Sequence, residues 1–271
     1  MSDTLHHALP PAARPRRFKT VRTVGAVILR EMMTSYGRSP GGYAWAILQP
    51  VGGIALMSFI LSTGFRIRTP GLGTSFPLFL ATGLLMLSMF LSIAGNVANS
   101  LMRNKPLLFY PGVKYTDTLI AGFLLTTLTQ ILVIYAIIGG IHIVFDLKSI
   151  LDMGAVLMAI GLSAALGLGV GTLNCFLFNA FPLWGNIWGV LTRPLFLVSC
   201  VIFLFEDIPR EFQDMAWWNP IIHLVALMRR GFYASYDATY ASPLYVGILS
   251  MVTLTFGLLF LNRFHRTFLE R

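Results

Sequence analysis

The arginines are the residues of this sequence best suited to hold a ligand, because a guanidinium donates two parallel hydrogen bonds to a phosphate or a carboxylate. Lys and Arg number 20 against 11 Asp and Glu, which gives a net charge of +9. The basic residues lie beside long apolar segments, as Arg30 and Arg38 do before Trp45. This pattern favours membrane phospholipid or an anionic substrate as the partner and disfavours nucleic acid.

Residues arranged for catalysis or for metal binding are missing from the sequence. It contains no GxxxxGK(S/T) loop, whose backbone would cradle nucleotide phosphates, and no HExxH motif. The five histidines are scattered, and Cys175 and Cys200 lie inside apolar runs, so we expect neither a metal site nor a disulfide framework. We predict no catalytic residue and no cofactor bound by this chain, and we interpret it as a transport subunit and not as an enzyme.

Composition indicates an integral membrane protein. Of 271 residues, 56% are hydrophobic and only 11% are charged, and the mean hydropathy is +0.73. A soluble domain carries about 25% charged residues. We therefore predict an all-α membrane protein that forms a single permease-like domain over residues 1–271. No apolar run precedes Ala46, so a cleaved signal peptide is not expected.

Six apolar stretches are long enough to cross a membrane, since a hydrocarbon layer about 30 Å thick needs about 20 apolar residues per helix. They are approximately residues 46–64, 76–101, 118–144, 151–178, 186–205 and 243–262. The fifth contains Arg193 and Pro194, so it is the weakest of the six and could be broken or re-entrant. In the fourth, Gly167, Gly169 and Gly171 form a small-residue face that lets helices approach closely.

The distribution of basic residues predicts the orientation of these spans. With six spans and an inner N-terminus, fourteen of the 20 Lys and Arg residues lie on the inner side. Short cytoplasmic loops of membrane proteins carry such an excess. We therefore expect both termini to be cytoplasmic, in a multi-pass protein of the bacterial inner membrane.

Residues 21–36 have the pattern of an amphipathic helix that lies in the membrane interface. At 100° per residue, one face is apolar. It carries Val21, Val24, Ile28, Met32 and Tyr36. Arg30 lies on the opposite face, and Val27 falls outside the apolar face. We predict an interfacial helix, which is either an anchor alone or a functional element.

Two further segments are neither simple spans nor ordinary loops. Between spans two and three, Pro106 and Pro111 interrupt a basic stretch that holds a Leu-Leu-Phe-Tyr cluster. It is either a partner surface or a plain basic loop. Residues 206–242 are too polar to span and too apolar for a solvated loop, so we expect short helices inserted half-way into the outer leaflet. Trp217 and Trp218 would then lie at the headgroup level.

Several short motifs occur in a fixed order relative to these spans. Before and in the first span lie Arg30, Glu31, Tyr36, Gly41, Gly42, Trp45 and Pro50. Between spans two and three lie Asn99, Leu107, Leu108, Phe109, Tyr110 and Pro111. The outer segment carries Asn219, Pro220, Arg229 and Arg230. In these motifs the chain resembles the permease subunits of ABC-type polysaccharide exporters, most closely the capsular polysaccharide branch.

The resemblance implies a homodimer of six-span subunits that binds two copies of a cytosolic ATPase. ATP and Mg would be bound by that partner and not by this chain. The dimer would enclose a channel for a lipid-linked polysaccharide, and capsular systems add a periplasmic co-polymerase and an outer-membrane export protein. Relatives often have an Arg-Asp pair after span four, where this chain has Asn179 and Ala180. A coupling role for that loop is therefore not expected.

Three groups of residues follow as candidate functional sites. The place where an anionic glycolipid enters is expected at Arg30, Arg38, Tyr43 and Trp45. Coupling to the ATPase is expected at Glu31, Leu107, Leu108, Phe109, Tyr110 and Pro111. An outer gate, or the channel itself, is expected at Arg193, Trp217, Trp218, Asn219, His223, Arg229 and Arg230. The arginines of the first group could instead only follow the inner-side charge bias, and the outer tryptophans could be interface anchors.

The resemblance implies export of an acidic capsular polysaccharide as the function. An O-antigen or a teichoic-acid-type glycan is the alternative substrate, and a membrane scaffold or enzyme is a weaker alternative. Within the single domain we separate five segments: a basic tail (1–19), the interfacial helix and access segment (20–45), spans one to five (46–205), the outer gate segment (206–242), and span six with a cytoplasmic tail (243–271).

Overall fold

The computed structural model describes residues 19–36, 42–64, 70–110, 112–147 and 151–270, and within them every regular element is helical. Arg38 and Pro111 lie outside the described residues. The elements in chain order are α1 (Lys19–Tyr36), α2 (Gly42–Phe59), η1 (Ile60–Gly64), α3 (Phe76–Arg103), α4 (Lys105–Leu108), α5 (Tyr115–Phe145), α6 (Met153–Ala180), α7 (Trp184–Thr192), α8 (Leu195–Val198), η2 (Phe205–Asp207), α9 (Arg210–Trp217), α10 (Pro220–Phe232) and α11 (Pro243–Glu270).

Five of the described helices are long and apolar enough to cross a membrane, in segments 44–63, 76–103, 115–145, 153–180 and 243–265. They correspond to predicted spans one, two, three, four and six. The fifth predicted span, residues 186–205, is not a continuous helix, so the expected count of six spans is not confirmed. It breaks at Pro194 into α7 and α8. Proline lacks the amide proton that would continue the helix, and the nine residues of α7 rise only about 14 Å.

Helix α6 is packed between α3 and α11 through glycines on two of its faces. A Cβ atom on Gly167 would lie 2.8 Å from Cβ of Ile93 on α3. A Cβ atom on Gly169 would lie 2.4 Å from the Ser250 carbonyl oxygen on α11. Such distances leave no room for a side chain, so the backbones of the three helices approach one another closely. The glycines let neighbouring helices approach closely, as predicted, but they lie on two faces of α6 and not on one.

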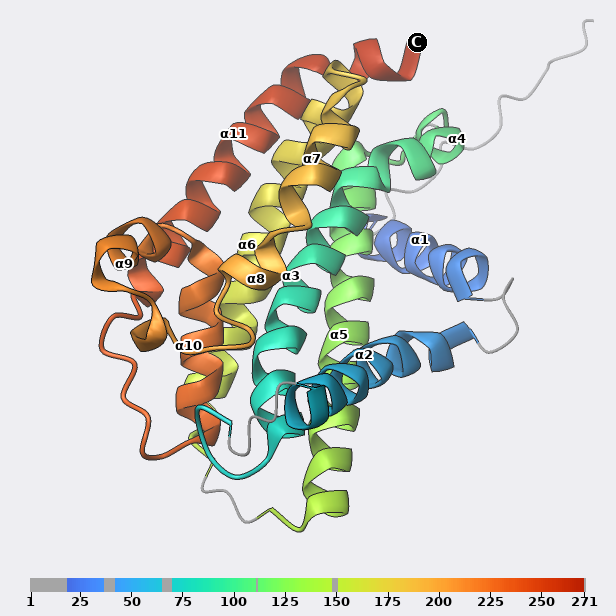
Figure 1. Cartoon of the computed structure of the whole chain (residues 1–271). Helices are drawn as coiled ribbons and strands as arrows, with labels where there is room; N and C mark the ends of the chain where they lie inside the picture. The colour runs from blue at the N-terminus through green and yellow to red at the C-terminus, as the bar shows by residue number, and fades with distance from the viewer. Residues whose placement is uncertain (1–18, 37–41, 65–69, 111, 148–150, 271) are drawn as a thin grey trace, which may run out of the picture.

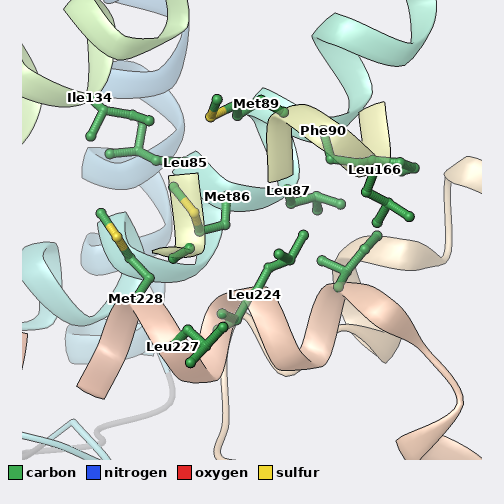
Figure 2. Close-up of a cluster of buried hydrophobic side chains, with 14 of the residues drawn as sticks. Leu85, Met86, Leu87, Met89, Phe90, Ile134, Leu166, Leu224, Leu227 and Met228 are labelled. Atoms are coloured by element: carbon green, nitrogen blue, oxygen red, sulfur yellow. The ribbon is translucent and has the colours of Figure 1, made fainter. Parts of the chain in front are cut away.

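Helix α10 is part of the core, although its sequence is too polar to span a membrane. Ile221 to Arg229 are all buried. In Figure 2, Leu224 and Met228 extend from α10 toward Leu85 and Leu166 of α3 and α6. Burial of these apolar side chains fixes α10 against the two most enclosed spans.

The two ends of the bundle carry different elements (Figure 1). At one end, here named the α4 end, the rings of Tyr115 and His265 are 4.6 Å apart beside α4. At the other, the α10 end, the Asp152 amide donates to the Gly231 carbonyl over 2.9 Å. Helix α2 crosses α3 and α5 obliquely, and much of its surface is exposed.

Helix α1 packs on α5 at the α4 end, but not through the face predicted from the sequence. Val24 and Val27 are buried against Ala121 of α5. Val21 and Met33, in contrast, are exposed. The prediction that Val27 lies outside the apolar face was therefore wrong. The apolar residues of α1 form two groups: Val24 and Val27 pack against α5, and Val21 and Met33 are exposed on the surface.

Candidate functional site

A buried polar cluster joins α1 to the junction of α3 and α4. Glu31 of α1 is only 3% exposed. Its Oε1 atom lies 3.2 Å from Nη2 of Arg103 and accepts a hydrogen bond of 2.7 Å from Nδ2 of Asn104. Charge-assisted bonds of this kind are stronger than neutral ones, and a buried carboxylate requires them. The cluster therefore holds α1 on the bundle in one register.

Asn104 connects this cluster to α4 directly. Its Oδ1 atom accepts a hydrogen bond of 3.2 Å from Nη1 of Arg30, and its backbone carbonyl accepts from the amides of Leu107 and Leu108 at 2.9 and 3.3 Å. Arg103 also donates from Nη1 to Oδ1 of Asn96, about two turns back along α3, at 3.0 Å. We call Arg30, Glu31, Asn96, Arg103 and Asn104 the α1–α3 hub.

The predicted coupling residues divide into an inner and an outer pair. Leu107 packs beside Val24 and Val27 of α1, and Leu108 packs against the main core. Phe109 and Tyr110 are each 67% exposed at the α4 end. Glu31 is enclosed in the hub, so its carboxylate supports α1 and does not form an outer contact in this conformation. The exposed aromatic pair is the part of this stretch that can meet another protein.

The residues at which a substrate was expected to enter are not gathered into one site. Arg30 is engaged with Asn104. Trp45 is exposed on α2, and Tyr43 lies on the first turn of the same helix. Arg38 is outside the described residues.

Two residues predicted to hold a polyanion are instead enclosed in the bundle. Arg229 is 1% exposed and donates from Nη1 to the Phe203 carbonyl at 2.9 Å and from Nη2 to the Val201 carbonyl at 2.8 Å. Its guanidinium also lies 4.1 Å from the centroid of the Phe79 ring. Arg229 thus satisfies backbone carbonyls that the break after α8 leaves free.

His223 has both ring nitrogens occupied. The Ser242 amide donates to Nδ1 at 3.2 Å, so Nε2 carries the proton and donates to the Trp217 carbonyl at 2.8 Å. Burial lowers the pKa of His223, and the bond to Trp217 opposes this only in part. His223 is therefore a neutral link between α10 and the segment before α11, and it is not placed to attract an anion.

Trp217 and Trp218 form an aromatic cluster with Tyr245. The rings of Trp217 and Tyr245 are 5.0 Å apart, and those of Trp217 and Trp218 are 5.7 Å apart. Trp217 donates from Nε1 to the Tyr240 carbonyl, and Trp218 is largely exposed. Asn219 accepts from the Ile221 amide and so caps α10. Arg193 and Arg230 are exposed.

Arg103 and Asn104 were missed as functional candidates by sequence reasoning. Both were visible as polar residues placed directly at the end of an apolar span, but their partner Glu31 lies 73 residues before Asn104. A pairing over that distance depends on how α1 folds back onto α3. Only the position of the two residues, and not the identity of their partner, could have been found from the sequence.

The length and apolar character of its helices define a multi-pass α-helical membrane protein. The particular family follows from comparison: the model of the ABC-2 type transporter family matches residues 22–233, and the chain belongs to this family. The match begins within α1 and ends just beyond α10, so it includes the hub and the two tryptophans of the aromatic cluster, but not Tyr245. The family resemblance seen in the sequence is confirmed.

Three proteins similar to this chain come from three bacterial species. The polysialic acid transport protein KpsM of Escherichia coli is 31% identical over 87% of this chain and 91% of its own length. The capsule polysaccharide export inner-membrane protein CtrC of Neisseria meningitidis serogroup B is 29% identical, over 90% and 92%. The capsule polysaccharide export inner-membrane protein BexB of Haemophilus influenzae is 27% identical, also over 90% and 92%.

Proposed function

We propose that this chain is the permease half of an ATP-driven exporter that moves a lipid-linked, acidic capsular polysaccharide across the inner membrane. The observation that carries the proposal is the similarity to KpsM, CtrC and BexB over about nine-tenths of both chains. A match of that extent covers most of the chain and not a single shared motif.

The energy for transport would come from a separate ATPase. The sequence has no nucleotide-binding loop of its own. The hub supports a route for coupling, because it connects α1, the end of α3 and the start of α4 through a few short polar contacts. An ATPase whose contacts with Phe109 and Tyr110 differ between its two nucleotide states would favour different positions of α4 and, through the hub, of α1 and the end of α3.

The working unit would be a homodimer with two ATPase subunits, and both termini would face the cytoplasm. In this orientation the α4 end is cytoplasmic and the α10 end is periplasmic. The exposed apolar surfaces of α2, α7 and α8 are available either to a second copy or to lipid. A periplasmic co-polymerase and an outer-membrane protein would continue the path of the polymer.

Deletion of the gene in its own host tests the proposal. Surface polysaccharide should be lost and polymer should accumulate inside the cells, and re-expression of the intact chain should restore it. A strain whose capsule is unchanged would contradict the proposal. Loss of O-antigen or of a teichoic-acid-type glycan, with the capsule intact, would assign the chain to the alternative substrate class.

A further inference from the structure

A cavity of about 650 Å³ lies between α2, α3 and α5, next to the hub, with which it shares Asn96. Its volume is within the range of about 300–1,000 Å³ that is usual for small-molecule sites. Half of the residues that line it are polar. These are Gln49 on α2, Ser88, Ser92 and Asn96 on α3, and Thr126, Thr129 and Gln130 on α5.

The polar lining lies inside the membrane-crossing part of the bundle. Asn96 is seven residues before the end of α3 at Arg103, and Gln130 is fifteen residues after the start of α5 at Tyr115. At 1.5 Å per residue these positions are about 10 Å and about 22 Å from the α4 end. Polar groups at such a depth persist only when they are paired or line a cavity that holds water or a ligand.

The chemistry of the lining selects for a neutral, hydroxyl-rich ligand. Among the described residues around the cavity, none carries a charge, so a phosphate or a carboxylate would find no counter-ion there. Amides and hydroxyls can each donate and accept, as the hydroxyls of a sugar do. The Oε1 atom of Gln130 is buried without a hydrogen-bond partner, so it can accept a hydrogen bond from a hydroxyl of the ligand.

The surroundings of the cavity fit a sugar that is attached to a lipid. Trp45 is 58% exposed beside it and offers a flat apolar ring, which can cover the C–H face of a sugar. Further toward the α10 end, α2 and α5 line a second cavity of about 490 Å³ with apolar residues such as Val51, Ile54 and Ile141. Along α2 and α5, a polar cavity is thus followed by an apolar cavity in the direction of the α10 end.

We propose that the polar cavity binds an uncharged sugar unit of the lipid-linked glycan through its amides and hydroxyls, with the apolar cavity beside the lipid. This inference rests on the proposed function and adds the subsite. Recognition would depend on hydrogen bonds at membrane depth and not on the arginines that precede α2. Asn96 belongs to both the cavity and the α1–α3 hub, because it accepts from Arg103. The subsite is therefore in direct contact with the coupling apparatus.

Photolabelling of the full-length protein in phosphatidylcholine nanodiscs tests the proposal. The probe is an alkyl maltoside with a photoreactive group in its chain, and the matched probe is an alkyl phosphocholine with the same chain. The maltoside should label peptides of α2, α3 and α5. Gln130→Leu and Gln49→Leu, on two different helices, should each reduce this labelling about tenfold, the effect of one lost hydrogen bond of about 1.4 kcal/mol.

The control variant is Leu128→Ala, on the exposed side of α5, which should label like the wild type. Melting temperatures of all variants identify any that fail to fold, and the second glutamine variant then carries the test. Unchanged maltoside labelling in both glutamine variants would overturn the proposal, and so would equal labelling of these peptides by the phosphocholine probe. The assay requires no export, so it can succeed or fail independently of the capsule phenotype.

Discussion

Arg229 is a buried cation whose partners are backbone carbonyls. Both of its terminal nitrogens donate to the segment after α8, and its neighbour Arg230 is exposed. A guanidinium can serve this purpose because its fork donates in two directions at once, and it keeps its charge more readily than an ammonium would. The residue therefore stabilises the irregular segment between α8 and α9.

We predict that Arg229→Leu destabilises the protein severely. It leaves the carbonyls of Val201 and Phe203 unpaired, and each buried unpaired group costs about 1–3 kcal/mol. The melting temperature of the purified protein should fall by many degrees, and yield should drop. The matched variant Arg230→Leu removes an exposed charge and should change little. Equal melting temperatures for the two variants would show that Arg229 is not a structural support.

We also predict a pH dependence that originates at His223. Burial lowers the pKa of His223 in the folded protein below its ordinary value of about 6.5. As pH falls below about 6.5, the unfolded chain therefore takes up a proton before the folded one does, and folding stability declines. Melting temperature should decrease between pH 7.5 and pH 5.5, and His223→Gln should reduce this slope. A slope that is identical in the variant would assign the effect to other groups.

At the scale of elements, the bundle is organised around α6. Its glycines alternate between two neighbours, with Gly167 facing α3 and Gly169 facing α11. In lipid there is little hydrophobic drive to bring helices together, so close packing of backbones takes a larger share of the stability. The arrangement requires glycine at particular positions of α6 and not at others.

We predict that Gly169→Ala disrupts the contact of α6 with α11. The new Cβ atom would lie 2.4 Å from the Ser250 carbonyl oxygen, and backbone atoms cannot yield cheaply, so a loss of about 1–3 kcal/mol is expected. Gly161→Ala is the control on the same helix, because a Cβ atom there meets nothing within 4 Å. Thermal unfolding in detergent measures both. A control that loses as much as Gly169→Ala would show general intolerance of alanine in α6.

At the scale of the whole molecule, the α4 end is where the proposed ATPase would act. Cysteines at Phe109 or Tyr110, which are both exposed, should crosslink to the co-expressed ATPase, as seen by a shifted band under non-reducing conditions. A cysteine at Leu108, which packs against the core, should crosslink far less. If the complex assembles and neither exposed position crosslinks, α4 is not the docking element.

Much of the fold could be predicted from the sequence, and the reason is physical. A helix in lipid must satisfy its own backbone and present apolar side chains all round, so α3, α5, α6 and α11 are visible as uninterrupted apolar runs. The segment around Pro194 could not be resolved in this way. Hydropathy reports the surroundings of a residue, but it does not show that Arg229 will satisfy the carbonyls of Val201 and Phe203.

The candidate site was less predictable than the fold. Glu31 and Leu107, which were both predicted as coupling residues, lie on neighbouring elements of the structure, α1 and α4. Their individual roles depend on tertiary contacts. Glu31 was expected at the surface of contact with the ATPase, but it is buried beside Arg103. His223 and Arg229 look like free polar groups in the sequence, and only the folding of α10 into the core encloses them.

The bonds from Arg229 to the Val201 and Phe203 carbonyls have a consequence for how the chain is synthesised. Those carbonyls leave the ribosome 28 and 26 residues ahead of the arginine that satisfies them. Until α10 has been made, the nascent segment after α8 would hold unsatisfied backbone groups in lipid, a state that the bilayer strongly disfavours. The insertion machinery must therefore keep this stretch in a wet environment and release it together with α10, so the two are integrated as one unit.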